Sequence, residues 1–258
     1  MDFNKYYEDR QKLVNTFLEK RLEKKGISRV DEAMAYSLLA GGKRIRPIIL
    51  MATADALGVS GYNFLPVACG LEMIHTYSLI HDDLPCMDDD EYRRGRLTNH
   101  KVFGEAMALL AGDALLTLAF EVMLEQKNVP AEALIETVRE VAMCAGNFGM
   151  VGGQVIDLDS EGRQISEEEL RKLHAGKTGA LFIAAVRSGA RLSGAASDEL
   201  LALTKFADLL GLAFQITDDI LDVEGDAAQM GKAAHSDEKK HKSCLLYTSD
   251  AADDRISV

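Results

Sequence analysis

Apolar residues along this chain recur at intervals of three and four, the period of a helix with one buried face. Glycine or proline marks the short gaps between these stretches. Runs with a period of two that are rich in β-branched residues are missing, so strands are not expected. The pattern predicts an all-α, single-domain antiparallel helical bundle. The expected helices cover residues 3–25, 30–40, 46–57, 66–83, 104–126, 131–150, 167–173, 180–191 and 198–223.

Composition narrows the class of protein. A hydrophobic fraction of 47% is ample for a core, and the net charge of −12 argues against a general nucleic-acid surface. The cysteines show no CxxC spacing and no disulfide pattern. The charged start of the chain has no apolar signal core. Asp113 and Glu121 interrupt the most apolar segment, 106–124. These charges predict that the segment is a buried helix and not a membrane span, so we expect a cytoplasmic protein.

Two acidic clusters stand out within apolar helical sequence, DDLPCMD at 82–88 and DDILD at 218–222. Carboxylates are costly to bury without a cation, and hard oxygen ligands suit Mg²⁺. Either cluster alone is typical of a solvated acidic helix end. Because Mg²⁺ completes its shell with water and substrate phosphates, the pair predicts a magnesium–diphosphate complex held between two carboxylate walls.

The spacing within each cluster has a geometric consequence. Residues six apart on a regular helix point about 120° away from each other, so Asp82 and Asp88 would not share a face. Pro85 lacks the N–H that would bond the carbonyl of His81, so a bulge or short loop there would return Asp88 to the side of Asp82. Asp218 and Asp222 are four apart and share a face without such a device.

Basic residues accompany both clusters. GGKRIRP at 41–47 places three cations at a turn entering a helix, where free N–H groups add to anion affinity. Further cations lie in RRG at 93–95, in KTG at 177–179, and at Lys232 and Lys242. One diphosphate does not need so many cations, and the set suggests two diphosphates bound together.

With these motifs, residues 38–243 resemble the trans-prenyl diphosphate synthases, and most closely the bacterial members that make farnesyl diphosphate. The resemblance rests on GGKRIRP, EMIHTYSLIHDDLPCMDDD (72–90), RRG, AGDALL (111–116), GGQVIDLDSEG (152–162), HAGKTGAL (174–181), FQITDDILD (214–222) and GK (231–232). It implies an all-α bundle around a deep central cavity and a homodimer. The family pattern stops after residue 243, so 1–243 is expected to be a C-terminally truncated synthase domain and 244–258 a non-native tail.

The resemblance also implies roles for individual residues. Three Mg²⁺ ions on the allylic diphosphate would be ligated by Asp82, Asp88 and Asp218. That diphosphate would also contact Arg93, Lys177, Gln215 and Lys232, with Lys177 and Thr178 near the carbocation. The diphosphate of isopentenyl diphosphate would be held by Lys43, Arg46, His75 and Arg94, and Lys242 would reach in when the site closes.

Chain length of the product is expected to depend on the helix that precedes the first aspartates. In the family, a bulky aromatic at the position of Tyr77 floors the cavity. Helix geometry alone places Tyr77 about 140° around the helix from Asp82, whereas Ser78 is only about 40° away. That Tyr77 faces the cavity is therefore implied by the resemblance and not by helix geometry.

The implied reaction condenses isopentenyl diphosphate with dimethylallyl or geranyl diphosphate to give farnesyl diphosphate. Three alternatives remain at this stage. The first is the same chemistry with a longer product such as geranylgeranyl diphosphate, and the second is a class I terpene cyclase, which would lack GGKRIRP and the second aspartate motif. The third is an inactive, truncated subunit that binds diphosphate.

Overall fold

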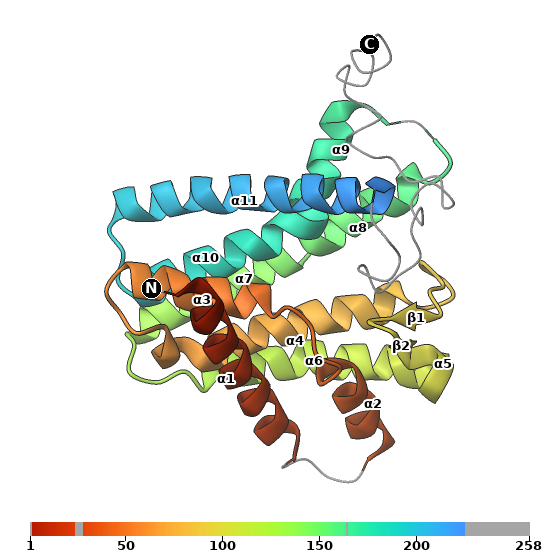
Figure 1. Cartoon of the computed structure of the whole chain (residues 1–258), viewed down its shortest axis with the longest axis horizontal. Helices are drawn as coiled ribbons and strands as arrows, with labels where there is room; N and C mark the ends of the chain where they lie inside the picture. Colours follow the sequence, from red (N-terminus) through yellow and green to blue (C-terminus); the bar gives the residue numbers. More distant parts are fainter. Residues whose placement is uncertain (1, 24–27, 164, 225–258) are drawn as a thin grey trace. The chain divides into compact units, whose positions relative to one another are not determined.

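The computed structural model of the protein describes residues 2–23, 28–163 and 165–224, and these are mostly helical (Figure 1). The helices are α1 (Phe3–Glu23), α2 (Arg29–Leu38), α3 (Ile45–Ala56), α4 (Leu65–Asp82), α5 (Asn99–Phe103), α6 (Glu105–Leu124), α7 (Ala131–Ala145), α8 (Met150–Ser160), α9 (Glu167–His174), α10 (Ala180–Leu192) and α11 (Ser197–Glu224). A 3₁₀ turn, η1, covers Gly61–Phe64, and a π-helical turn, η2, covers Ala175–Gly179. The predicted all-α class is confirmed.

The chain divides into two compact units. The first contains Met1–Val141 and Ala184–Leu203, and the second contains Ala142–Ile183 and Thr204–Val258. The boundaries fall inside α7, α10 and α11. The expected single domain over 1–243 and the expected tail at 244–258 stay predictions, because the structure describes the second unit only as far as residue 224.

The first unit is built around α4, which packs along α6 and also contacts α1, α2 and α3. Helix α4 is buried on most sides, and its Leu71, Met73 and Ile74 are fully buried. Leu115 and Met123 of α6 are fully buried as well. The most apolar segment of the chain is therefore a helix of the core, as the sequence predicted.

Among the residues that the structure describes, two helices have the length and apolarity of a membrane span, one within Glu105–Leu124 and one within Ser197–Asp218. Length and composition alone are a weak sign of a span, since core helices pass the same test. Much of the first stretch is buried inside the protein, whereas little of the second is.

The predicted helix over 131–150 is wrong in its last turn, residues 146–149. Helix α7 ends at Ala145, and a turn follows in which the N–H of Gly149 bonds the carbonyl of Gly146 at 3.0 Å. Gly146 and Gly149 allow the backbone to leave the helix here. Helix α8 follows over Met150–Ser160. No helix was predicted between residues 150 and 167, so α8 was missed. The other predicted helices agree with the structure to within three residues at each described end.

Short elements were not predicted. Helix α5 and the two-residue strands β1 (Tyr92–Arg93) and β2 (Arg96–Leu97) follow the first acidic cluster. The strands pair antiparallel, with Tyr92 opposite Leu97 and Arg93 opposite Arg96. Elements of this size carry too few residues for a hydrophobic period to be recognised. Their hairpin positions both arginines of the RRG motif.

Candidate active site

The first acidic cluster begins on the last residue of α4 and continues into a tight loop. The carbonyl of His81, which Pro85 cannot bond, accepts a hydrogen bond from the N–H of Leu84 at 3.1 Å. The N–H of Asp88 then bonds the carbonyl of Asp82 at 2.8 Å. The loop therefore folds back and brings the backbone of Asp88 against that of Asp82. The predicted return of Asp88 to the side of Asp82 is confirmed at the level of the backbone.

Asp83 has a different role from its neighbours. Its side chain is 4% exposed and forms a bidentate ion pair with Arg93. Nη2 of Arg93 lies 2.6 Å from Oδ1, and Nε donates to Oδ2 at 3.0 Å. Burial raises the pKa of Asp83, and the Arg93 guanidinium opposes that rise. Arg93 also lies 3.5 Å from Asp90. The acidic cluster thus holds one of the predicted diphosphate ligands in place by a bidentate pair.

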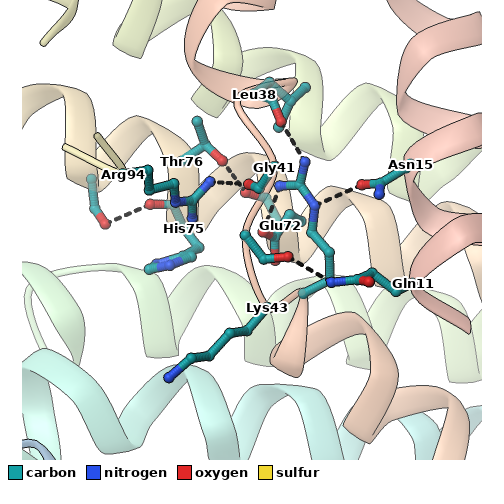
Figure 2. A network of polar contacts seen from close by, with 12 residues as sticks. Gln11, Asn15, Leu38, Gly41, Lys43, Glu72, His75, Thr76 and Arg94 are labelled. Atoms are coloured by element: carbon teal, nitrogen blue, oxygen red, sulfur yellow. Dashed lines mark hydrogen bonds and ion pairs between the residues drawn. The ribbon is translucent and has the colours of Figure 1, made fainter. Parts of the chain in front are cut away.

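The three cations of the basic turn between α2 and α3, which are Lys43, Arg44 and Arg46, have different surroundings. Arg44 points inward, where Nη1 lies 2.8 Å from Oε1 of Glu72, and both side chains are almost fully buried. Lys43 is exposed and extends away from this network, as Figure 2 shows. Arg46 follows on the first turn of α3, whose N-cap residue, Arg44, makes no side-chain capping bond. Lys43 and Arg46 thus flank the N-terminus of α3, a position that favours an anion.

Positive charge is concentrated beside this turn. Nη1 of Arg94 donates to the carbonyl of Gly41 (Figure 2). Desolvation, together with the charge of Arg94, lowers the pKa of Arg46 to about 10, although Glu72 opposes the shift. Desolvation and the surrounding guanidiniums hold the pKa of His75 well below its usual value. His75 is therefore neutral near pH 7. The guanidiniums of Arg44, Arg46 and Arg94 around it carry more positive charge than the buried carboxylate of Glu72 balances.

The basic cluster and the acidic loop meet along α4. His75 and Asp82 are seven positions apart on this helix, and such residues share a face about 10 Å apart along the axis. One face of α4 therefore joins a basic end to an acidic end within the first unit.

Tyr77 and Ser78 lie between these two ends. Tyr77 is 7% exposed, and its ring packs edge-on against His81 with the centroids 5.6 Å apart. Burial and the nearby charge of Asp82 raise the pKa of Tyr77. Ser78 is half-buried and donates to the carbonyl of His75 in its own helix at 2.9 Å. Only Tyr77 has the bulk and burial expected of a cavity floor.

The second unit carries the other predicted ligands around η2. Nζ of Lys177 lies 2.6 Å from Oδ2 of Asp157, and Oγ1 of Thr178 donates to Oε1 of Gln215 at 3.2 Å. Gly153 of α8 lets the backbones meet, since a Cβ there would lie 2.1 Å from the N atom of Lys177. Single π-turns of this kind are frequent at functional sites.

Asp218, on α11 in the second unit, is exposed. Its predicted position opposite Asp82 and Asp88, which belong to the first unit, stays a prediction. Lys232 and Lys242 lie outside the described residues, as does the side chain of Asp222. Within the described part of the chain, no three His, Cys, Asp or Glu side chains gather closely enough to bind a metal by themselves.

Sequence reasoning missed four residues that hold the site residues in place. Asp83 and Glu72 pair with arginines in the first unit, and Asp157 pairs with Lys177 in the second. Arg44 was counted with the other cations, although it is buried in an ion pair. For Glu72 a signal existed, because a lone carboxylate inside the apolar run 67–74 needs a buried partner.

The profile of the polyprenyl synthetases matches residues 27–255, nearly the whole chain. The chain belongs to the polyprenyl synthetase family. This agrees with the resemblance that the sequence motifs carry.

Two curated relatives of this polyprenyl synthetase differ in the product that their names state. The farnesyl diphosphate synthase of Geobacillus stearothermophilus is 47% identical over 245 residues, which cover 94% of this chain and 82% of the relative. The geranylgeranyl diphosphate synthase of Cyanophora paradoxa is also 47% identical, over 92% of this chain and 80% of the relative. Overall identity therefore does not separate the two products.

Solved structures agree with the polyprenyl synthetase fold. A geranyltransferase from Helicobacter pylori, complexed with magnesium and isoprenyl diphosphate, superposes with a TM-score of 0.83 at 30% identity, covering 97% of this chain and 86% of that one. An apo farnesyl or geranylfarnesyl diphosphate synthase from Zymomonas mobilis gives a TM-score of 0.81 at 38% identity, covering 90% and 83% of the two chains.

Proposed function

We propose that this polyprenyl synthetase is a magnesium-dependent prenyltransferase that condenses isopentenyl diphosphate with dimethylallyl or geranyl diphosphate to give farnesyl diphosphate. The observation that carries the proposal is the single face of α4 with excess positive charge near His75 and carboxylates at Asp82. Two diphosphates bound at these ends would place their hydrocarbon parts side by side. The names of the bacterial relatives support the farnesyl product.

Two groups of residues would bind the two substrates, isopentenyl diphosphate and the allylic diphosphate. Lys43, Arg46 and Arg94 would neutralise the diphosphate of isopentenyl diphosphate, while neutral His75 would contribute a hydrogen bond. Arg93, Lys177 and Gln215 would hold the allylic diphosphate, and Thr178 would face the carbocation that remains when this group leaves. Exclusion of water by the buried helices would protect that cation from quenching.

The donor set fits magnesium. Asp82 and Asp88, joined through their backbones, offer hard oxygen ligands on one side, and Asp218 would offer another from the second unit. One or two carboxylates suffice, since Mg²⁺ keeps water and phosphate oxygens in its shell. Mg²⁺ bound there would neutralise the charge that grows on the departing diphosphate.

We propose further that the protein works as a cytoplasmic homodimer. Related synthases of this family are expected to share that organisation, and apolar residues such as Leu109, Leu110 and Leu124 are exposed on α6. Exposed apolar side chains in such number on one helix are a feature of interfaces between subunits.

The direct test of the function is turnover of labelled isopentenyl diphosphate with geranyl diphosphate and Mg²⁺, followed by chromatography of the dephosphorylated products. Farnesol supports the proposal, and geranylgeraniol supports the longer-chain alternative. Binding of both substrates without any product would identify an inactive, diphosphate-binding subunit. A cyclic hydrocarbon made from the allylic substrate alone would identify a cyclase.

Tyr77→Ala is expected to lengthen the product. If the buried ring is the floor of the cavity, its removal lets the chain grow to geranylgeranyl diphosphate or beyond. Tyr77→Phe is the matched control, because it keeps the ring and removes only the hydroxyl, and it should still yield the farnesyl product. Farnesol as the only alcohol from Tyr77→Ala would show that the ring does not limit elongation.

Two further variants separate the diphosphate sites. Arg46→Ala is expected to raise KM for isopentenyl diphosphate about tenfold or more, because it removes a charge-assisted contact to that substrate. Lys177→Ala should instead lower kcat and raise KM for the allylic substrate. Steady-state kinetics with each substrate varied in turn checks this. Equal effects of both changes on both substrates would contradict the assignment.

A further inference from the structure

The turn that carries Lys43 and Arg46 is held from outside by the first helix of the chain. Three residues of this turn have left-handed backbone conformations: Gly41 has a φ of 82°, Gly42 of 125° and Arg44 of 50°. Such a turn is not regular secondary structure, and a non-glycine residue such as Arg44 adopts this conformation at a cost. Contacts with neighbouring elements are therefore needed to define it.

Helix α1 supplies these contacts from one face. Tyr7, Gln11 and Asn15 are four positions apart and form a stripe along the helix. The hydroxyl of Tyr7 donates to the carbonyl of Lys43. Nε2 of Gln11 donates to the carbonyl of Gly42 at 2.9 Å (Figure 2). Two successive peptide groups of the turn are thereby fixed by α1.

The third member of the stripe acts on the buried cation. Oδ1 of Asn15 accepts from Nε of Arg44 at 2.9 Å. The same guanidinium bonds Glu72 of α4 at 2.8 Å and the carbonyl of Leu38 of α2 at 2.7 Å (Figure 2). Arg44 therefore ties the turn to three helices at once, and α1 completes the set.

From these contacts we infer that the Tyr7–Gln11–Asn15 stripe of α1 is a positioning element for the anion-binding turn. It orients the peptides on both sides of Lys43, and so sets where that side chain and the N-terminus of α3 point. In this role the stripe acts through the turn and would not itself contact the diphosphate. The inference deepens the proposed function and rests on it for the identity of the ligand, isopentenyl diphosphate.

The test compares α1 variants that lose the hydrogen bonds to the turn with α1 variants that keep them. Tyr7→Phe combined with Gln11→Met removes both donors to the turn with little change in side-chain volume. Tyr6→Phe is the matched control, because Tyr6 donates from the same helix to Asp55 at 2.6 Å, away from the turn. Lys12→Met, at an exposed position of α1, controls for a change of helix surface.

Two readouts are measured on the full chain. One is the dissociation constant of inorganic pyrophosphate by calorimetry without divalent metal, where the aspartates cannot hold the anion. The other is KM for each substrate with Mg²⁺. For the double variant we expect the pyrophosphate dissociation constant and KM for isopentenyl diphosphate to rise about tenfold, with kcat and the allylic KM within about twofold. Both control variants should leave these four quantities unchanged.

Several outcomes would overturn the inference. They are unchanged pyrophosphate affinity in the double variant, equal weakening by Tyr6→Phe, or no pyrophosphate binding by the unmodified protein. Circular dichroism checks the fold, and Tyr7→Phe alone carries the test if the double variant unfolds. An unmodified protein that binds pyrophosphate but makes no prenyl product would refute the proposed function, while the pyrophosphate affinities would still decide the role of α1.

Discussion

Asp82→Asn and Asp218→Asn should each reduce turnover about a thousandfold or more while leaving the helical content unchanged. Each change replaces a carboxylate that we propose to bind metal by an amide of the same shape. If both acidic clusters hold ions on the same leaving group, neither can replace the other. The measurement is kcat for farnesyl diphosphate formation at saturating Mg²⁺, with removal of the metal by excess chelator as a parallel experiment.

Asp89→Asn is the control for this prediction. Asp89 lies in the same loop, its side chain is 61% exposed, and its φ of 48° is one that asparagine adopts readily. The same chemical change there should leave kcat nearly unaffected. The magnesium assignment would fail if Asp82→Asn retained full activity, or if excess chelator left the unmodified protein active.

Arg44→Met should lower the free energy of unfolding by about 3–5 kcal/mol, because it leaves the carboxylate of Glu72 buried without its ion-pair partner. Urea denaturation followed by circular dichroism measures the change. The double variant Arg44→Met with Glu72→Leu removes both charges and should recover much of the loss, since two apolar groups can fill the space of a buried pair.

The exposed pair between Glu168 and Lys172 provides the comparison. Its atoms lie 2.6 Å apart, as close as any in the buried pair, but both side chains are largely exposed. Lys172→Met should therefore not change the unfolding midpoint measurably. Equal losses in Arg44→Met and in its double variant would mean that the buried pair stabilises the fold by packing and not by charge.

Most of the fold was predictable from the hydrophobic pattern, and its failures have physical causes. Helix α4 was found because its apolar positions run unbroken from Val67 to Ile74 apart from Glu72. The break between α7 and α8 was missed because Gly146 and Gly149 do not disturb an apolar pattern, although they allow the backbone to leave the helix. Hydrophobic periodicity records which faces are buried, and not where backbone hydrogen bonds stop.

The site was predictable in its residue types but less so in its pairings. The return of Asp88 toward Asp82 followed from the chemistry of Pro85. The division of labour between Lys43 and Arg44 did not, because neighbouring cations in a turn look alike until the backbone conformation directs one outward and one inward. The pair between Asp83 and Arg93 likewise depends on a hairpin too short to recognise.

The π-helical turn η2 has a consequence for how this stretch of chain is compared with others. A π-turn holds one residue more than an α-helical turn, and one residue corresponds to about 100° of rotation. Leu170 and Leu181, eleven positions apart, would point almost the same way on an unbroken α-helix, but the extra residue between them separates their directions. The chain from α9 to α10 therefore has two registers, and an alignment that closes the extra residue would place Lys177 and Thr178 more than a quarter of a turn from where they lie.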